Sequence, residues 1–403
     1  MKILYINSFY APDEIGGAEK SVRFLAEALQ QQGHTTAVLT LGRQTEKSSL
    51  NSVAIYRISA PNLYFPGDAG GQPGWKKMLW HSIDSFNPLT IGHIEQVLDE
   101  FKPDVVHTNN LAGLSVSVWG AIHRRGVAIV HTLRDYYLLC PNTAMFKGGK
   151  PCQSRCVTCK TLSMPKASAA KYVDVVVGNS RFILNKHLAY GLFPSAEQQV
   201  IYNAYSPQSD EDCRPTDKIQ LGFIGRLAPS KGLELLIDGL RAAKLNRPVE
   251  LLVAGEGSPD YVATLQRRAD GLPVTFIGKV KPEAFYSRVH WTVVPSVWDE
   301  PLARVLFESF AHGVPVLGTD TGGTPELIRN DHNGYLFSAS SEATLAKLLE
   351  AIEIMPAPAY QALSIQARQA SQSFRPATVA SGYLEAYQAA IDAHSAIGKK
   401  VAG

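Results

Sequence analysis

Short runs of apolar, often β-branched residues alternate along the chain with stretches in which apolar residues recur every three or four positions. Residues 2–7 form the first such run, and residues 18–34 follow as an amphipathic pattern that ends at Gly33. This alternation is typical of βαβ units and predicts an α/β fold with parallel strands covered by helices. Further strands of the first half are predicted at residues 35–41, 103–110, 127–133 and 173–180.

The alternation stops at residues 204–218, a polar segment with two prolines, which we interpret as a linker. It resumes with predicted strands at residues 219–227, 248–257, 273–280, 291–296 and 314–320. The pattern therefore predicts two doubly wound, Rossmann-like domains, at 1–203 and 219–376, with a helix at about 377–395 that packs back on the first. A ligand is expected in a crevice where the strand ends of the two domains face each other.

Composition agrees with two soluble domains, since 403 residues exceed the usual size of one core. No run is long enough to span a bilayer, and the opening residues lead directly into loop and helix signals, unlike a signal peptide. We expect a cytoplasmic protein. We also consider peripheral association with the inner face of the cytoplasmic membrane. The first 200 residues carry 20 Lys and Arg against 14 Asp and Glu. This excess suits an anionic ligand or membrane surface but is too dispersed for nucleic acid.

Two glycine-containing loops follow predicted strands and are candidates for phosphate binding. Gly16 and Gly17 stand at the start of a helix, where free backbone N–H groups favour an anion, although a simple turn is the alternative. Arg226 and Lys231 follow the strand at 219–227 and together match the charge of a diphosphate, although they could also be two solvated cations.

Two glutamates, Glu300 and Glu308, lie eight positions apart between two predicted strands. We expect them to be two helical turns apart, and because eight residues of α-helix advance about 12 Å, they are too far apart to share a proton. We expect them to hold opposite ends of one extended ligand. Residues 318–328 add a loop of small residues that leads to a helix start near Pro325.

The order of these motifs resembles the family 4 glycosyltransferases, which are retaining enzymes of GT-B fold that use nucleotide sugars. The resemblance covers the Gly-Gly loop, the Arg226 and Lys231 pair, the two glutamates and the segment at 313–328. It implies hexose transfer from a nucleotide diphosphate sugar to a glycan or a polyprenyl-diphosphate-linked acceptor, in bacterial surface polysaccharide or lipopolysaccharide synthesis. A nucleotide-sugar epimerase and a non-catalytic nucleotide-sugar-binding protein are the alternatives.

The resemblance also implies a role for each motif. Glu308 would bind the ribose hydroxyls, and Glu300 would bind the transferred sugar. Arg226 and Lys231 would bind the diphosphate and stabilise its developing charge, so that no metal is required for catalysis. The remaining donor contacts that the resemblance implies are Gly16, Gly17, Gly278, Val280, Leu302, Ala303 and Arg304.

One segment departs from the family pattern. Where the family carries a His-Asp pair after a strand, this chain has Arg134 and Asp135, with His131 as a conceivable substitute for the family histidine. We expect Arg134 to bind an anion of donor or acceptor, held from behind by Asp135. His107, at the end of another predicted strand, either contacts a substrate or is a hydrogen-bonded structural residue.

Four of the five cysteines, Cys140, Cys152, Cys156 and Cys159, fall within twenty residues. In a reducing cytoplasm this spacing suggests a structural zinc site, with free thiols as the alternative. Cys213, in the linker, is expected to have no role.

An acceptor-side segment at residues 70–90 combines Trp75, Trp80 and Phe86 with Lys76 and Lys77. Aromatic residues beside lysines suit a membrane interface, and they also suit an ordinary packed helix.

Overall fold

The computed structural model describes residues 1–13, 16–59, 61–205 and 217–402, and it divides into two compact units. Unit 1 comprises Met1–Met145, Gln153–Ala204 and Pro376–Gly403, and unit 2 comprises Phe146–Cys152 and Tyr205–Arg375. The segment Phe146–Cys152 thus groups with unit 2, although the sequence boundaries assigned it to the first domain. Most of the expected linker, with Cys213, lies outside the described residues.

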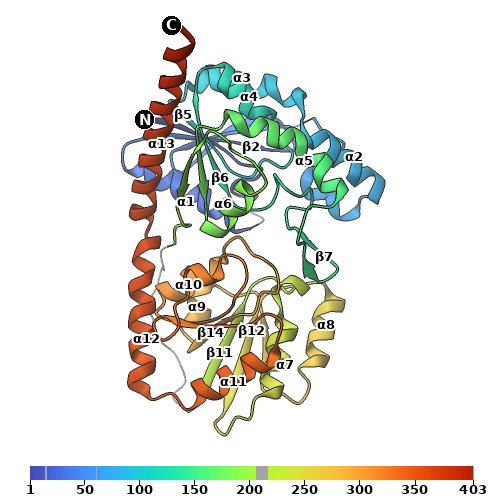
Figure 1. The fold of residues 1–403 in the computed structure, drawn as a ribbon, viewed down its shortest axis with the longest axis vertical. Coiled ribbons are helices and arrows are strands. Elements are labelled where there is room, and N and C mark those ends of the chain that lie inside the picture. Colours follow the sequence, from blue (N-terminus) through green and yellow to red (C-terminus); the bar gives the residue numbers. More distant parts are fainter. Residues whose placement is uncertain (14–15, 60, 206–216, 403) are drawn as a thin grey trace. The chain divides into compact units, whose positions relative to one another are not determined.

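Unit 1 is built on a sheet of strand order β10-β9-β6-β5-β1-β2-β4-β3, with helices around it (Figure 1). Its neighbouring strands pair in parallel, except that β3 runs antiparallel to β4. The strands are β1 (Lys2–Ile6), β2 (Thr35–Leu41), β3 (Glu46–Leu50), β4 (Val53–Ile58), β5 (Val105–Thr108), β6 (Ala128–Leu133), β9 (Val175–Gly178) and β10 (Glu197–Val200). The helices are α1 (Gly17–Gln31), α2 (Gly74–Ser85), α3 (Ile91–Phe101), α4 (Ser117–Arg124), α5 (Val157–Ala169), α6 (Arg181–Leu188) and α13 (Pro376–Ala402).

The last helix, α13, completes the core of unit 1. Its Tyr383 and Tyr387 are buried with Val130 of β6, Tyr5 of β1 and the apolar face of α1. The Tyr387 hydroxyl also hydrogen-bonds Nδ1 of His107, a residue 280 positions earlier in the chain. The C-terminal residues are therefore part of the first domain's fold.

Unit 2 has a second sheet of strand order β13-β12-β11-β14-β15-β16, in which neighbouring strands pair in parallel. The strands are β11 (Ile219–Ile224), β12 (Val249–Ala254), β13 (Val274–Gly278), β14 (Trp291–Val294), β15 (Val316–Thr319) and β16 (Gly334–Phe337). The helices are α7 (Leu233–Ala242), α8 (Pro259–Arg268), α9 (Pro282–Tyr286), α10 (Arg304–Ala311), α11 (Glu342–Glu353) and α12 (Ala357–Ala370). A short hairpin of β7 (Phe146–Lys147) and β8 (Lys150–Pro151) also belongs to this unit.

The two sheets, which are parallel except for the β3–β4 pair, confirm the predicted α/β fold class. In each unit, parallel strands end at one edge of the sheet, so the loops that leave this edge can jointly form a site. Among the described residues, no helix is long and apolar enough to cross a membrane.

Candidate active site

The candidate donor residues of unit 2 lie in loops at the carboxyl edge of its sheet. Lys231 ends a short 3₁₀ helix (Pro229–Lys231) between β11 and α7, and Glu300 lies in the loop between β14 and α10. Lys231 Nζ donates a hydrogen bond of 2.6 Å to Glu300 Oε1, and the two side chains are 21% and 13% exposed. The fold therefore brings together two residues that are 69 positions apart in the chain.

Glu300 retains an unused oxygen in this pair. Its Oε2 is buried and has no hydrogen-bond partner among the described residues. Leaving a buried acceptor unsatisfied costs about 1–3 kcal/mol. A ligand hydroxyl that donated to Oε2 would remove this cost, which makes Glu300 a suitable group for binding a sugar.

Close backbone contacts fix the loop that carries Glu300. Gly323 N–H donates to the carbonyl oxygen of Glu300 at 2.8 Å. At Gly322, with φ of +58°, a Cβ would lie 2.2 Å from the same oxygen. Gly232, with φ of +68°, packs equally closely on the loop, because a Cβ there would lie 1.9 Å from Pro295 O. The loops after β11 and β15 thus hold Glu300 beside Lys231.

Glu308 is a buried residue of α10 with two hydrogen-bond donors. Arg304 Nε donates to Glu308 Oε1 at 2.6 Å, and the Tyr286 hydroxyl donates to Oε2 at 3.2 Å. Burial and the nearby Glu308 carboxylate raise the pKa of Tyr286 well above its usual value, so the hydroxyl remains a donor. Glu308 is therefore an oriented carboxylate that can accept further hydrogen bonds.

The helical spacing expected for the two glutamates is wrong. Helix α10 begins at Arg304, so Glu300 precedes it in a loop. The residue before a proline is disfavoured in the helical region, and Glu300 precedes Pro301. The segment at 324–326 is likewise only a short 3₁₀ turn, Thr324–Glu326, and not the start of a longer helix.

The other predicted donor contacts of unit 2 lie at the same sheet edge. Arg226 follows β11 and is exposed, and Gly278 ends β13 in an exposed position with φ of +67°. Val280 is partly buried and packs against a small apolar cluster. Leu302 and Ala303 are buried in the loop before α10.

In unit 1, Arg134 follows β6 and is half-buried. Its guanidinium donates to two neutral amide oxygens, Oδ1 of Asn109 at 2.8 Å and Oδ1 of Asn203. No Asp or Glu in the described part of the chain forms an ion pair with it. The side chain is therefore held in place by neutral groups, and among the described residues no carboxylate pairs with its charge.

Asp135 differs from its expected role behind Arg134. Its Oδ1 accepts a hydrogen bond from Tyr137 N at 2.8 Å. Burial raises its pKa to about 6, opposed by that hydrogen bond and by the nearby Lys166 ammonium. Lys166, which the sequence did not indicate, is thus a cation close enough to influence Asp135.

Lys166 of α5 is a buried cation that sequence reasoning missed. Its Nζ donates to Tyr137 O at 2.9 Å and lies 3.4 Å from the centre of the Tyr137 ring. Burial lowers its pKa to about 8, although Asp84 and Asp135 act against this. Burial also raises the pKa of Asp84 to about 6, and Asp84 Oδ1 accepts from Gly113 N at 2.6 Å. The helical pattern around Lys166 gave no sign of its burial.

His107 is fully buried and both ring nitrogens are engaged. Nδ1 pairs with the Tyr387 hydroxyl at 2.8 Å and Nε2 with Thr132 Oγ1 at 2.7 Å. Burial holds its pKa well below the usual value. These contacts favour the structural alternative over a substrate contact. His131 is also buried, and its Nδ1 pairs with Thr108 Oγ1 at 2.9 Å.

The first glycine loop starts α1 as expected. Gly16 precedes the helix in an extended conformation, and its N–H donates to Glu19 Oε2 at 2.8 Å. A carboxylate of the chain thus occupies one of the N–H groups proposed for a phosphate. Gly17 is the first residue of the helix.

The clustered cysteines are free thiols in this structure. Burial, with hydrogen bonds to Cys156 and Cys140, raises the pKa of Cys159 to about 12. Cys152 belongs to unit 2, whereas the other three belong to unit 1. Among the described residues, no group of three or more His, Cys, Asp or Glu is arranged to hold a metal ion. Zinc binding by these cysteines stays a prediction.

Comparison with known proteins agrees with the fold and the order of motifs. Residues 15–209 match the family described as Glycosyltransferase Family 4, and residues 208–370 match Glycosyl transferases group 1. An uncharacterized 42.6 kDa protein in the cps region of Klebsiella pneumoniae is 35% identical over 83% of this chain and 89% of its own length.

Two solved structures share the fold. Sucrose-phosphate synthase from Thermosynechococcus elongatus has a TM-score of 0.75 at 20% identity, over 96% of this chain and 98% of its own. HepE from Anabaena, solved in complex with UDP, has a TM-score of 0.71 at 20% identity, over 96% and 100%. The chain therefore belongs to the family 4 glycosyltransferases and has the GT-B fold.

Proposed function

We propose that the protein is a retaining hexosyltransferase that uses a nucleotide diphosphate sugar. The observation that carries this proposal is the pair of Lys231 and Glu300, with the unsatisfied Oε2 of Glu300 beside it. A cation that can bind a diphosphate thus lies next to a carboxylate that can accept from a sugar hydroxyl. In a nucleotide sugar, the diphosphate and the sugar are likewise adjacent. HepE, a structural neighbour, was solved in complex with UDP-glucose, which supports this class of donor.

We propose that unit 2 binds the donor along its sheet edge. Glu308 accepts hydrogen bonds from the ribose, and Lys231 and Arg226 bind the diphosphate. The backbone amides at Leu302, Ala303 and Arg304, around the start of α10, contact the sugar and phosphate, and the loop at Gly278 to Val280 contacts the base. In this arrangement Glu300 exchanges part of its contact with Lys231 for a contact with the sugar.

The proposed reaction needs no side chain as nucleophile. The acceptor oxygen forms a bond to the anomeric carbon while the bond from that carbon to the diphosphate oxygen breaks. The leaving diphosphate oxygen takes the acceptor proton on the same face of the sugar, which preserves the anomeric configuration. Lys231 and Arg226 stabilise the negative charge that develops on the diphosphate, and their two positive charges can replace a divalent metal.

In unit 1 we propose that Arg134 binds an anion, either the donor diphosphate or an acidic group on the sugar or acceptor. A guanidinium keeps its charge and offers a fixed set of donors, unlike the neutral histidine usual in the family. Asn109 and Asn203 orient this side chain without neutralising it.

We propose a glycan or polyprenyl-diphosphate-linked acceptor and a role in surface polysaccharide synthesis. The relative in a cps region supports this role. Helix α2 exposes Trp75, Met78 and Leu79 at helical spacing, with Trp75 69% exposed, and Lys76 and Lys77 are adjacent. This arrangement suits peripheral binding to an anionic membrane, with the apolar side chains in the interface and the lysines at the headgroups.

The proposed function is tested in two steps. A thermal-shift screen of UDP, GDP, ADP and their hexose conjugates should raise the melting temperature for one nucleotide class. Release of that nucleotide should then require an acceptor, and nuclear magnetic resonance (NMR) of the product should show a retained anomeric configuration. A sugar converted without acceptor would identify an epimerase, and binding without any conversion would identify a non-catalytic protein. Sedimentation of the protein with vesicles of anionic lipid tests the membrane contact. The Trp75→Ala variant should no longer sediment with them.

A further inference from the structure

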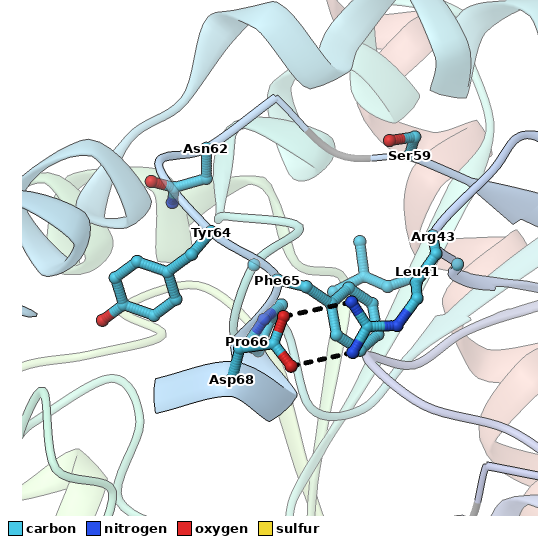
Figure 2. A pocket seen from close by; sticks show the side chains of 10 residues that line it. Leu41, Arg43, Ser59, Asn62, Tyr64, Phe65, Pro66 and Asp68 are labelled. Atoms are coloured by element: carbon cyan, nitrogen blue, oxygen red, sulfur yellow. Dashed lines mark hydrogen bonds and ion pairs between the residues drawn. The ribbon is translucent and has the colours of Figure 1, made fainter. Parts of the chain in front are cut away.

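A cavity of about 240 Å³ lies in unit 1, outside every residue assigned above to donor binding. It is formed by the loops after β2 and β4, and Gly113 of the loop after β5 closes one side. Figure 2 shows the side chains that line it, among them Arg43, Asp68, Tyr64 and Phe65. The cavity therefore opens among loops at the carboxyl edge of the sheet.

The charged side chains of this cavity neutralise each other. Arg43 and Asp68 form two parallel hydrogen bonds, Nη2 to Oδ1 at 2.8 Å and Nη1 to Oδ2 at 3.1 Å (Figure 2). The pair raises the pKa of Arg43 and lowers the pKa of Asp68, so both groups stay ionised. An anionic ligand would meet the Asp68 carboxylate, and a cationic ligand would meet the guanidinium. A neutral ligand with several hydroxyls can hydrogen-bond to both groups.

Aromatic rings held in fixed positions supply the apolar part of the cavity. The Arg43 guanidinium lies 4.9 Å from the centre of the Phe65 ring, and Phe65 packs edge-on against Phe9 at 5.7 Å. Tyr64 stacks on Trp80 at 5.7 Å, and Trp80 Nε1 donates to Tyr64 O at 2.9 Å. Rigid rings beside polar groups match the two sides of a sugar ring, which has a C–H face and a rim of hydroxyls.

The size of the cavity limits the ligand. Pockets for drug-sized molecules hold roughly 300–1,000 Å³, so this cavity is suited to a single ring. We infer that this cavity binds one neutral hexose-type ring through Arg43, Asp68, Tyr64 and Phe65.

The position of the cavity on the sheet shows how far its ligand lies from Arg134. Strand order puts β2 three strands away from β6, which Arg134 follows. At about 4.8 Å between neighbouring strands, the cavity lies roughly 14 Å along the sheet edge from Arg134. The loop after β5 connects the two places, since Asn109 contacts Arg134 and Gly113 lines the cavity.

The identity of the ring rests on the proposed transferase function. If the protein is a transferase, the ring is a neutral sugar of an oligosaccharide acceptor, distant from the sugar that receives the transferred hexose. The enzyme would then extend a preformed glycan and would discriminate against acceptors of one sugar. If the cavity held only solvent, the KM for the acceptor would not depend on the number of sugars in it.

The decisive variant is Arg43→Ala with Asp68→Ala, which removes the polar pair and leaves the net charge unchanged. The pair is exposed, at 68% and 42%, so the fold should survive, and thermal melting checks this. Lys47→Ala with Glu100→Ala is the matched control, because it removes another exposed pair of unit 1, at 59% and 43%, that does not line the cavity. Phe65→Leu tests the aromatic contact separately.

Binding is measured by saturation-transfer NMR with methyl glycosides of glucose, galactose and mannose, and with a methyl glucuronide as the anionic probe. At least one neutral glycoside should bind, and the cavity variants should weaken it at least fivefold while the control leaves it unchanged. With an oligosaccharide acceptor, the cavity variants should raise KM and leave kcat near the parent value. Absence of glycoside binding, preference for the glucuronide, or equal binding by the Arg43 and Asp68 double variant would overturn the inference. If a neutral glycoside binds but no nucleotide sugar changes the melting temperature, the sugar-binding cavity is supported and the transferase proposal is refuted.

Discussion

The two glutamates of unit 2 should respond to removal in opposite ways, and nucleotide binding separates them. Glu308 is held by Arg304 and Tyr286. Glu300 is paired with Lys231 at 2.6 Å. In the proposed complex, Glu308 contacts the nucleoside and Glu300 contacts the sugar. The changes to compare are Glu308→Ala and Glu300→Ala.

For Glu308→Ala the loss follows from one charged hydrogen-bonding group. A hydrogen bond to a charged group contributes about 1.5–3 kcal/mol. The dissociation constant of the nucleoside diphosphate should therefore rise roughly 10- to 150-fold. Glu308→Gln keeps an acceptor oxygen and the packing of α10, and it should lose less affinity than the alanine variant.

For Glu300→Ala the same binding should stay equal or become tighter. Removal of the carboxylate leaves Lys231 free to contact the diphosphate, and it removes a negative charge next to the phosphates. At 4 Å such a repulsion amounts to about 1 kcal/mol in water and about 4 kcal/mol at an effective dielectric constant of 20. Turnover with the full donor should nevertheless fall, since the sugar loses its acceptor.

Isothermal titration calorimetry with the nucleoside diphosphate found in the thermal-shift screen measures both effects. Circular dichroism and melting of each variant control for misfolding. Equal losses of affinity in the two alanine variants would refute the assignment of the glutamates to opposite ends of the donor. A gain for Glu308→Ala and a loss for Glu300→Ala would reverse it.

Four further experiments test other parts of the molecule. Lys231→Ala should lower turnover roughly 10²-fold or more with the fold intact, because diphosphate charge is then unmatched; near-normal turnover would remove Lys231 from the mechanism. Arg134→Lys should keep partial activity in a transfer assay, and Arg134→His should not restore it; a fully active histidine variant would contradict anion binding there. Because burial raises the pKa of Asp84 from 3.8 to about 6, its neutral form stabilises the fold below pH 3.8, and this contribution is lost as the pH rises through about 6. Asp84→Asn should flatten that part of the stability profile in urea titrations, and an unchanged profile would show that Asp84 does not titrate there. Elemental analysis of reduced protein should find about one zinc per chain if the clustered cysteines bind metal, and none if they are plain thiols.

The sequence predicted the regular part of the fold because its signals are local. Residues 35–41 were expected as a strand and form β2 with the same bounds. The edge strand β3 was missed, since Glu46–Leu50 is largely polar and exposed and shows no apolar run. Its position is fixed by pairing with β4, which a local pattern cannot reveal.

The sequence predicted which residues form the candidate site, but not how these residues contact one another. Lys231 and Glu300 were recognised as separate motifs, whereas their hydrogen bond depends on loops from different strands. The carboxylates of Asp84 and Asp135 favour the charged form of the buried Lys166, and the sequence gives no sign of this proximity. Buried charges are stabilised by partners that are distant in the chain, so a single sequence shows the charge but not its balance.

The place of α13 in unit 1 bears on how the chain folds during synthesis. Residues of unit 2, Tyr205–Arg375, leave the ribosome before α13 does. At about 5–20 residues per second, Tyr383 and Tyr387 follow the first part of unit 1 by roughly ten to forty seconds. Unit 2 can therefore complete its fold first, while the apolar face that α13 covers is still open. A nascent chain released before residue 376 should bind chaperones through that face.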